Sequence, residues 1–259
     1  MLPEERLGRV NLVKHSEFTQ RNTRTQTDWL EFLADVEDRY WSGMYRYLRD
    51  EIKVKSLIIG TQQSYSPYFV QRKMDVIDMH GYWDTQSAVG GKWYQMRNTP
   101  QVGDPHGGVV GMAASHRLAG KPFIVSEYNY RGANTYASEA DLLMLAYASL
   151  QDWDGVFIFN YANNKYFNVD RMIGDEGFNG HSNRFAALLP AALMFHRGDV
   201  RPSVKPVTAK VTRTELLSKM RVAGSAPGTY DFGLDIKQPL KTGVAIEITD
   251  SVTNKVATS

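Results

Sequence analysis

The first long pattern in the chain is helical. From residue 28 to residue 50, apolar side chains return every three or four positions, as in an amphipathic helix with one buried face. Asp28 and Glu31 occupy positions that favour helix-capping carboxylates, so we expect the helix to begin at Asp28. The apolar positions are Leu33, Val36, Tyr40, Met44 and Tyr47.

Four short apolar runs follow this helix, and their length is typical of buried strands rather than helices. Helical patterns lie at residues 109–118, 138–150 and about 183–195, the last with Gly198 as its expected C-cap. Strands that alternate with helices predict an α/β fold with a parallel sheet. The four predicted strands are residues 54–61, 74–80, 123–127 and 154–160.

The pattern changes after Pro202. Residues 204–212 and 242–249 are rich in β-formers, and residues 224–228 read as a loop, so we expect strands without helical partners. We therefore divide the chain into a polar N-terminal segment (1–26), an α/β part (27–200) and a small β-rich appendage (201–259).

Composition narrows the function classes. The 259 residues carry a formal net charge of +2 from 30 basic and 28 acidic side chains spread along the chain, which predicts neither nucleic-acid binding nor membrane binding. The absence of cysteine excludes disulfides and thiolate chemistry. No signal peptide or membrane span is recognisable, so the location stays open between the cytoplasm and a fragment of a secreted enzyme.

Polar and aromatic side chains cluster where the predicted strands end, which is the edge of a parallel sheet that carries ligand sites. Aromatic rings stack on sugar rings, amides bond to hydroxyls, and a carboxylate can attack an anomeric carbon, so the set suits a carbohydrate. The candidates are Gln62 after the first strand, His80, Tyr82 and Trp83 after the second, Glu127 and Asn129 after the third, and Asn160 and Tyr161 after the fourth, with Trp93 as a further stacking ring.

Structural roles remain open for several of them. Glu127 could cap a turn or pair with Arg131, His80 could be a core histidine, and Trp83 and Trp93 could be packing residues. Asn163 and Asn164 are more typical of a turn than of a ligand site. The chain has no phosphate-binding glycine loop, no HExxH pattern and no nucleophile elbow, so we expect no metal and no cofactor.

Three motifs together resemble the second half of the clan A glycoside hydrolase barrel, a TIM-type fold found in cellulases and β-galactosidases. They are residues 80–83 (His-Gly-Tyr-Trp), 121–129 (Lys-Pro-Phe-Ile-Val-Ser-Glu-Tyr-Asn) and 151–161, and the resemblance spans about residues 27–200. It implies about four β/α units matching strands five to eight, with Glu127 as the catalytic nucleophile and His80 and Tyr82 lining the sugar site.

The chain departs from this family at the general acid. Clan A enzymes carry an acid/base glutamate on the fourth strand, usually within Asn-Glu, and no Asn-Glu occurs in this chain. A retaining glycosidase needs two carboxyl groups about 5–5.5 Å apart. The candidate substitutes for this acid are Asp84, Asp104 and Glu176, and Glu17 and Glu139 are weaker candidates.

Two function classes follow, and a third stays in view. The first is a retaining hydrolase of a β-linked glucan or galactoside, weakened by the missing acid. The second is a non-catalytic carbohydrate-binding or structural remnant, and the third is an α/β protein unrelated to sugars. Because a half barrel exposes sheet edges and apolar surface, we also expect homo-oligomers that close it, through the first and fourth strands or the helices beside them.

Overall fold

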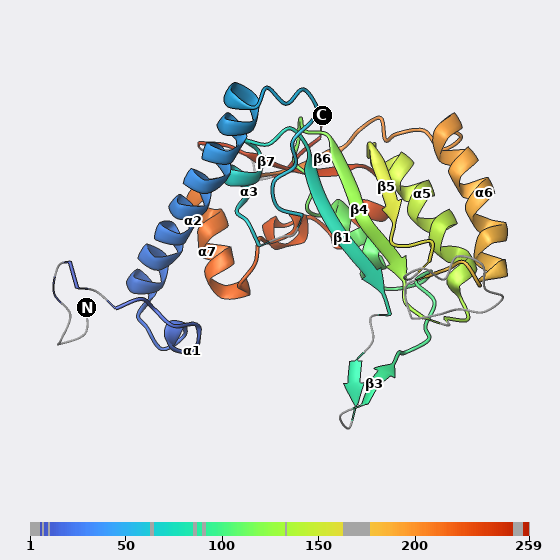
Figure 1. Cartoon of the computed structure of the whole chain (residues 1–259), viewed down its shortest axis with the longest axis horizontal. Helices are drawn as coiled ribbons and strands as arrows, with labels where there is room; N and C mark the ends of the chain where they lie inside the picture. The colour runs from blue at the N-terminus through green and yellow to red at the C-terminus, as the bar shows by residue number, and fades with distance from the viewer. Residues whose placement is uncertain are drawn as a thin grey trace.

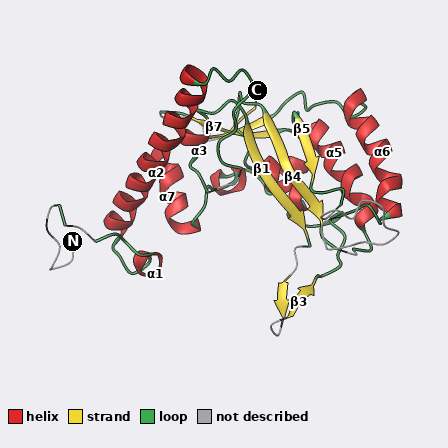
Figure 2. Ribbon diagram, in the orientation of Figure 1, coloured by secondary structure: helices red, strands yellow, loops and turns green. Residues whose placement is uncertain are grey.

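The computed structural model describes residues 6, 8, 9, 11–62, 65–84, 87–89, 92–132, 134–162, 177–250 and 256–258. The protein is α/β, as the alternation of patterns predicted. Figure 2 shows helices and strands distributed along the whole described chain. In chain order the elements are α1 (His15–Phe18), α2 (Thr23–Arg46), η1 (Tyr47–Glu51), α3 (Tyr68–Gln71), β1 (Ile77–Trp83), β2 (Ser87–Val89), β3 (Lys92–Gln95), α4 (Gly108–Ala114), β4 (Phe123–Tyr130), η2 (Ala137–Glu139), α5 (Ala140–Leu150), β5 (Gly155–Ile158), α6 (Ser182–Arg197), β6 (Val207–Val211), α7 (Arg213–Ala223), η3 (Thr229–Phe232), η4 (Gln238–Leu240), β7 (Val244–Ile248) and β8 (Val256–Thr258).

The main sheet is parallel and has the order β1-β4-β5. Its three strands are three of the four predicted ones, and β1 and β4 run three residues further than predicted, to Trp83 and Tyr130. In Figure 1 the arrowheads of the three strands point to the same end, with α2 and α7 to one side of the sheet and α5 and α6 to the other. Within the described residues the sheet is open and does not close into a barrel.

The prediction of a strand at residues 54–61 was wrong, because this segment contributes a single parallel bridge between Ile59 and Val76. Backbone groups that would pair with a neighbouring strand are bonded to side chains instead. Arg49 donates to the carbonyl oxygens of Val54 (2.7 Å) and Ser56 (2.9 Å). The segment therefore continues the sheet edge next to β1 without forming a regular strand.

The long helix was predicted correctly, but its start was not, and the apolar face expected to be buried is 39–58% exposed. Helix α2 begins at Thr23, where the Asn22 side chain accepts a hydrogen bond from the Thr25 amide at 2.9 Å. Asparagine is among the best N-cap residues, because its side-chain oxygen accepts from a backbone amide that has no partner within the helix. Asp28 lies inside the helix and reaches Arg24 only at 3.9 Å. At the end of α6, Gly198 has φ 68°, the left-handed C-cap that was predicted.

One face of the sheet packs on helices. Side chains alternate between the two faces of a strand, so Ile77 and Met79 share the buried face with Phe123 and Val125 of β4. Helix α4 lies directly under β1 at Gly81, where an added Cβ would meet Val109 Cγ1 at 2.2 Å. Glycine is therefore required for β1 and α4 to approach this closely.

Residues 201–259 contain a helix that was not expected. Strands β6 and β7 are parallel and are linked through α7, and β8 pairs antiparallel with β6. Thr212 and Glu215 form a full capping box at the start of α7. The spacing Thr-x-x-Glu before an apolar run was a readable signal for this helix.

This C-terminal segment is tied to the main sheet by buried hydrogen bonds. The Gln151 side chain donates to Pro239 O (2.6 Å) and accepts from the Val244 amide (2.9 Å). Tyr68 donates to Pro227 O at 2.7 Å. Buried residues of both segments form one contiguous hydrophobic cluster. The β-rich segment thus shares its core with the parallel sheet.

Candidate functional site

The C-terminal ends of β1 and β4 bring His80 and Glu127 side by side. Met79 pairs with Val125 but His80 pairs with Glu127, so Ser126 is an extra residue in β4. Such a β-bulge changes the direction in which the following side chains point. Here it places Ser126 and Glu127 next to His80, although strict alternation would separate them.

A chain of contacts links four side chains at this bulge. Glu127 Oε2 lies 3.0 Å from His80 Nδ1, and His80 Nε2 lies 3.0 Å from Ser126 Oγ. Ser126 donates through its hydroxyl to Asp78 Oδ2 (2.6 Å) and through its amide to Asp78 Oδ1 (2.9 Å). The side chain of Asp78 is 3% exposed, that of His80 13% and that of Glu127 27%, so accessibility rises along the chain toward Glu127.

Burial also affects the Asp78 carboxyl at the inner end of these contacts. Loss of solvation raises the pKa of the Asp78 carboxyl, against the lowering effect of its hydrogen bonds with Ser126 and of the nearby His80.

Tyr82 follows on the same strand and the same side as His80. The guanidinium carbon of Arg131 lies 4.2 Å from the centre of its ring, which is a cation–π contact. The Tyr82 hydroxyl oxygen is buried and has no hydrogen-bond partner among the described residues. Glu127 contacts His80 at 3.0 Å, and the Arg131 guanidinium lies over the Tyr82 ring.

Asn129 is fully buried and lies behind the site rather than at its surface. Its amide donates to Phe159 O and its oxygen accepts from the Arg184 guanidinium. Arg184 also bonds both oxygens of Asp141, at 3.0 and 3.1 Å. The structure thus separates Asn129 from the exposed candidates and places it in a buried polar network.

The end of β5 carries Asn160 and Tyr161. Asn160 is half-buried and accepts through its carbonyl oxygen from the Phe178 amide at 3.3 Å, and the peptide bond before it is cis. The Tyr161 ring is 47% exposed and lies edge-on to Phe178 and to Phe185 of α6. These two residues border an aromatic surface beside the sheet edge.

The two candidate tryptophans and Gln62 have different positions. The indole nitrogen of Trp83 donates to Thr99 O at 2.8 Å, and its ring packs against the core, as the packing alternative predicted. Trp93 belongs to β3, but its side chain lies outside the described residues. Gln62 is exposed in the segment that precedes α3.

The candidate substitutes for the general acid that lie in the described residues all form hydrogen bonds or ion pairs within the fold. Asp84 accepts from the Thr99 amide and hydroxyl and from Asn134, and Asp104 accepts from the amides of His106 and Gly108. Glu139 bonds the amide of Gln101 and the hydroxyl of Tyr130, and Glu17 pairs with Arg21. Glu176, Asn163 and Asn164 lie outside the described residues.

Sequence reasoning missed Asp78 and Ser126. Asp78 stands two residues before His80 in the predicted strand 74–80, and Ser126 directly precedes Glu127 in the motif 121–129. The period-2 alternation of a strand puts Asp78 on the same side as His80. The contact of Ser126 with His80 depends on the β-bulge, and no sequence pattern predicts this bulge.

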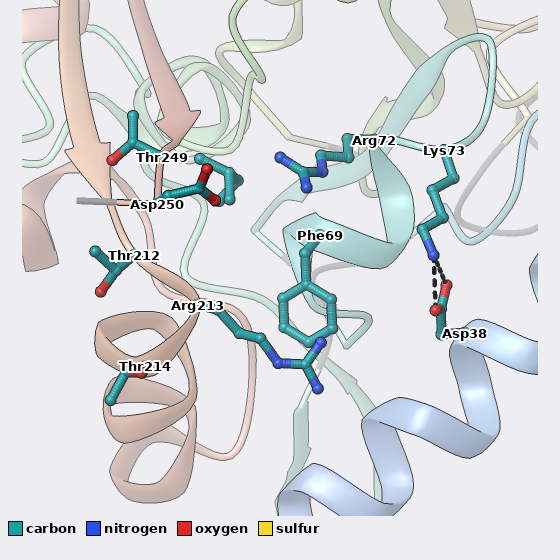
Figure 3. Close-up of a pocket in the computed structure, with 10 residues that line it drawn as sticks. Asp38, Phe69, Arg72, Lys73, Thr212, Arg213, Thr214, Thr249 and Asp250 are labelled. Atoms are coloured by element: carbon teal, nitrogen blue, oxygen red, sulfur yellow. Dashed lines mark hydrogen bonds and ion pairs between the residues drawn. The ribbon is translucent and has the colours of Figure 1, made fainter. Parts of the chain in front are cut away.

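A polar cavity of about 300 Å³ lies between α2, α3, the start of α7 and the end of β7. Figure 3 shows Lys73 paired with Asp38 and the Arg213 guanidinium over the Phe69 ring. Arg213 is also bonded to Glu31 and Asp35 on α2, each at 3.0 Å. Two of the cavity's three cations, Lys73 and Arg213, are thus paired with carboxylates, and we take the end of β1 and β4 as the candidate site.

Among the described residues, no group of three or more His, Cys, Asp and Glu is placed to hold a metal ion, and no helix is long and apolar enough to cross a membrane. The chain matches no protein-family model, no curated protein and no solved structure.

Proposed function

We propose that the chain forms part of a (β/α) barrel of the glycoside hydrolase type, acting on a β-linked glucan or galactoside by a retaining mechanism with Glu127 as nucleophile. The observation that supports this proposal is the placement of an accessible glutamate at the C-terminal edge of a parallel sheet, 3.0 Å from His80. Active sites of such barrels are built at this edge.

The contacts of Glu127 divide the roles of its two oxygens. His80 holds Oε2, which leaves Oε1 to attack the anomeric carbon. In this step a bond forms between Oε1 and the anomeric carbon while the bond from that carbon to the leaving oxygen breaks. Water then releases the sugar from the glycosyl-enzyme ester. His80 and Tyr82 line the sugar site, and Tyr161 offers a partly exposed stacking ring.

The leaving oxygen also needs a proton, and this decides which substrates turn over. The described candidates Asp84, Asp104 and Glu139 all accept hydrogen bonds from loop backbone or side chains. Substrates with an acidic aryl leaving group need little protonation, so they should react through the nucleophile alone.

Because the candidate substitute acids already accept hydrogen bonds within the fold, a second function, sugar binding without cleavage, is also favoured. If no other group supplies the proton, the site binds sugars without cleaving natural glycosides. The strand-end set would then act as a non-catalytic carbohydrate-binding surface. Hydrolysis assays and sugar titrations separate the two functions.

We also propose that a second copy of the chain covers its exposed apolar surface. On the sheet side, Phe157 is 57% exposed and Phe159 is 37% exposed, and among the described residues β5 has a strand neighbour on one side only. Helix α2 exposes Val36 and Tyr40 to 42% and 58%. Soluble proteins usually cover surfaces of this kind.

The test is hydrolysis of a panel of aryl β-glucosides and β-galactosides by the purified chain, beside Glu127→Gln and the matched control Glu51→Gln. Glu51 is exposed in η1, away from the site. We expect turnover in the wild type and the control, and a loss of at least about a thousandfold in Glu127→Gln, which keeps the shape of the side chain but removes the attacking oxygen.

Equal activity in Glu127→Gln would overturn the nucleophile assignment. Absence of turnover in the wild type, together with sugar binding by calorimetry, would support the binding function. Absence of both would remove carbohydrates from the proposal.

A further inference from the structure

The side chains from Asp78 to Glu127 form one network, and its hydrogen bonds need a definite number of protons. Three contacts of hydrogen-bond length connect four side chains: Asp78 with Ser126 (2.6 Å), Ser126 with His80 (3.0 Å) and His80 with Glu127 (3.0 Å). Each hydrogen bond needs one proton between its two heavy atoms.

Ordinary ionisation supplies only two of these protons. The Ser126 hydroxyl has one, and a neutral imidazole has one, whereas ionised Asp78 and Glu127 have none. If Ser126 donates to Asp78, then His80 must donate to Ser126 through Nε2. The bare Nδ1 would then face the bare carboxylate oxygen of Glu127 at 3.0 Å, which is a repulsive contact of two acceptors.

We propose that this network holds one additional proton and that His80 carries it, as an imidazolium that donates to Ser126 on one side and to Glu127 on the other. Asp78 and Ser126 are then positioning residues: they fix both ring protons of His80 and, through them, the orientation of Glu127. The buried carboxylate of Asp78 is the counter-charge, with its Oδ2 4.0 Å from His80 Nε2.

Among the described residues, few other charged groups lie near the His80 ring. Strand β1 contributes Asp78, His80 and Tyr82 to this side, and β4 contributes Ser126 and Glu127. Helix α4, packed on the opposite face of β1, meets Gly81 with the apolar Val109 and Met112. Among the described residues, Arg131 is the nearby cation, and it lies over the Tyr82 ring.

The variant Asp78→Asn gives a sharp test because it supplies the third proton covalently. The amide nitrogen introduced by this substitution would donate to Ser126, the Ser126 hydroxyl would turn to donate to His80 Nε2, and His80 Nδ1–H would donate to Glu127. All three hydrogen bonds are then satisfied with a neutral imidazole. The variant keeps the size of the side chain and the acceptor for the Ser126 amide.

The measurement is ¹⁵N NMR of the whole chain with labelled histidine at neutral pH, with the His80 signals assigned by their loss in His80→Gln. We expect both ring nitrogens of His80 to be protonated in the wild type, and only Nδ1 to be protonated in Asp78→Asn. A wild-type His80 with a single ring proton would overturn the proposal, and so would an imidazolium that persists in a folded Asp78→Asn variant.

A consequence for catalysis rests on the proposed function. Raising the pH until the additional proton leaves would break the contact that orients Glu127, so kcat/KM should fall on the alkaline side in the wild type, and Asp78→Asn should lack this fall. Because the NMR measurement needs no substrate, an inactive protein with a doubly protonated His80 would refute the proposed hydrolase and leave the proton assignment intact.

Discussion

At the scale of single residues, the strongest electrostatic constraint is the buried pair of Arg184 and Asp141. Their side chains are 2% and 1% exposed, and Arg184 also bonds Asn129. Arg184→Met would leave the Asp141 carboxylate buried without its cation, so we expect the free energy of unfolding to fall by about 3–5 kcal/mol. Urea denaturation measures the loss.

The matched control is Arg197→Met on the same helix. Arg197 is 67% exposed and lies 3.3 Å from Asp199, also exposed, so we expect a change below about 1 kcal/mol. Similar losses in both variants would contradict the assignment of the Arg184 cluster as a buried structural network.

The buried His116 should make the fold sensitive to acid. Burial lowers the pKa of His116 from its ordinary value of 6.5, although the carbonyl oxygens of Met112 and Ala226 act in the opposite direction. The unfolded chain therefore binds a proton at His116 more readily than the folded protein does. The stability that comes from a neutral His116 is present above about pH 6.5 and is lost as the pH falls.

We therefore expect His116→Gln to lose less stability than the wild type between about pH 7.5 and about pH 5.5, as measured by urea denaturation at each pH. The exposed His196 offers the control, since His196→Gln should follow the wild type. A wild-type pH dependence that His116→Gln reproduces would show that His116 does not cause the acid sensitivity.

Residue identity alone predicted part of the candidate site. Glu127 and His80 were expected at neighbouring strand ends and lie 3.0 Å apart. Asn129 was expected in the same place because strand ends share an edge, but its side chain is fully buried and bonds Phe159 O and Arg184. Long-range partners such as Arg184, 55 residues away, are set by tertiary packing, which no local pattern encodes.

At the scale of elements, the contact between β1 and α4 depends on Gly81. An alanine there would place its Cβ 2.2 Å from Val109 Cγ1, so β1 and α4 must separate or the valine must leave its rotamer. We expect Gly81→Ala to destabilise the fold by about 1–3 kcal/mol in urea denaturation. Because Gly81 follows His80, activity on aryl glycosides should fall as well.

Gly43→Ala is the opposite case and serves as the control. Gly43 lies inside α2, and a Cβ there would have no neighbour within 4 Å. Alanine has the higher helix propensity, so this variant should gain about 0.5–1 kcal/mol. Loss of stability in Gly43→Ala, or none in Gly81→Ala, would contradict the packing described for these elements.

The helices and strands that were predicted correctly are those with a single clear sequence pattern. Runs of apolar residues between turn residues located β1, β4 and β5, and helical periodicity located α2 and α6. It failed at residues 54–61, where Arg49 takes the carbonyl oxygens that strand pairing requires. It also missed α7, because the β-rich residues around it outweighed the Thr212–Glu215 capping signal.

At the scale of the whole molecule, the exposed stripe on α2 is the feature that most needs a partner. Phe32, Leu33, Val36, Tyr40 and Tyr47 are each between 42% and 58% exposed along one side of a 24-residue helix and the turn that follows it. This surface lies on the helix next to residues 54–61, where a half barrel would need completion. A second copy of the chain is the partner that we propose.

The charges beside the stripe indicate how two copies would pair. Asp28 and Asp35 lie in the first half of α2, and Arg39 and Arg46 lie in the second half on the same flank. In a two-fold dimer with antiparallel α2 helices, Asp28 and Asp35 of one copy would lie near Arg46 and Arg39 of the other. We therefore expect light scattering at micromolar concentration to give twice the chain mass of 29.3 kDa.

Replacing the centre of the stripe should separate the copies. Val36→Glu with Tyr40→Glu would place two carboxylates in each copy at the dimer contact, so we expect the mass of a single chain, while Val204→Glu, at a position 92% exposed away from α2, should leave the dimer intact. A single-chain mass for the wild type would end the proposal of a second copy. A dimer that survives the double substitution would move the contact away from α2, to the open edge at β5 and the exposed Phe157.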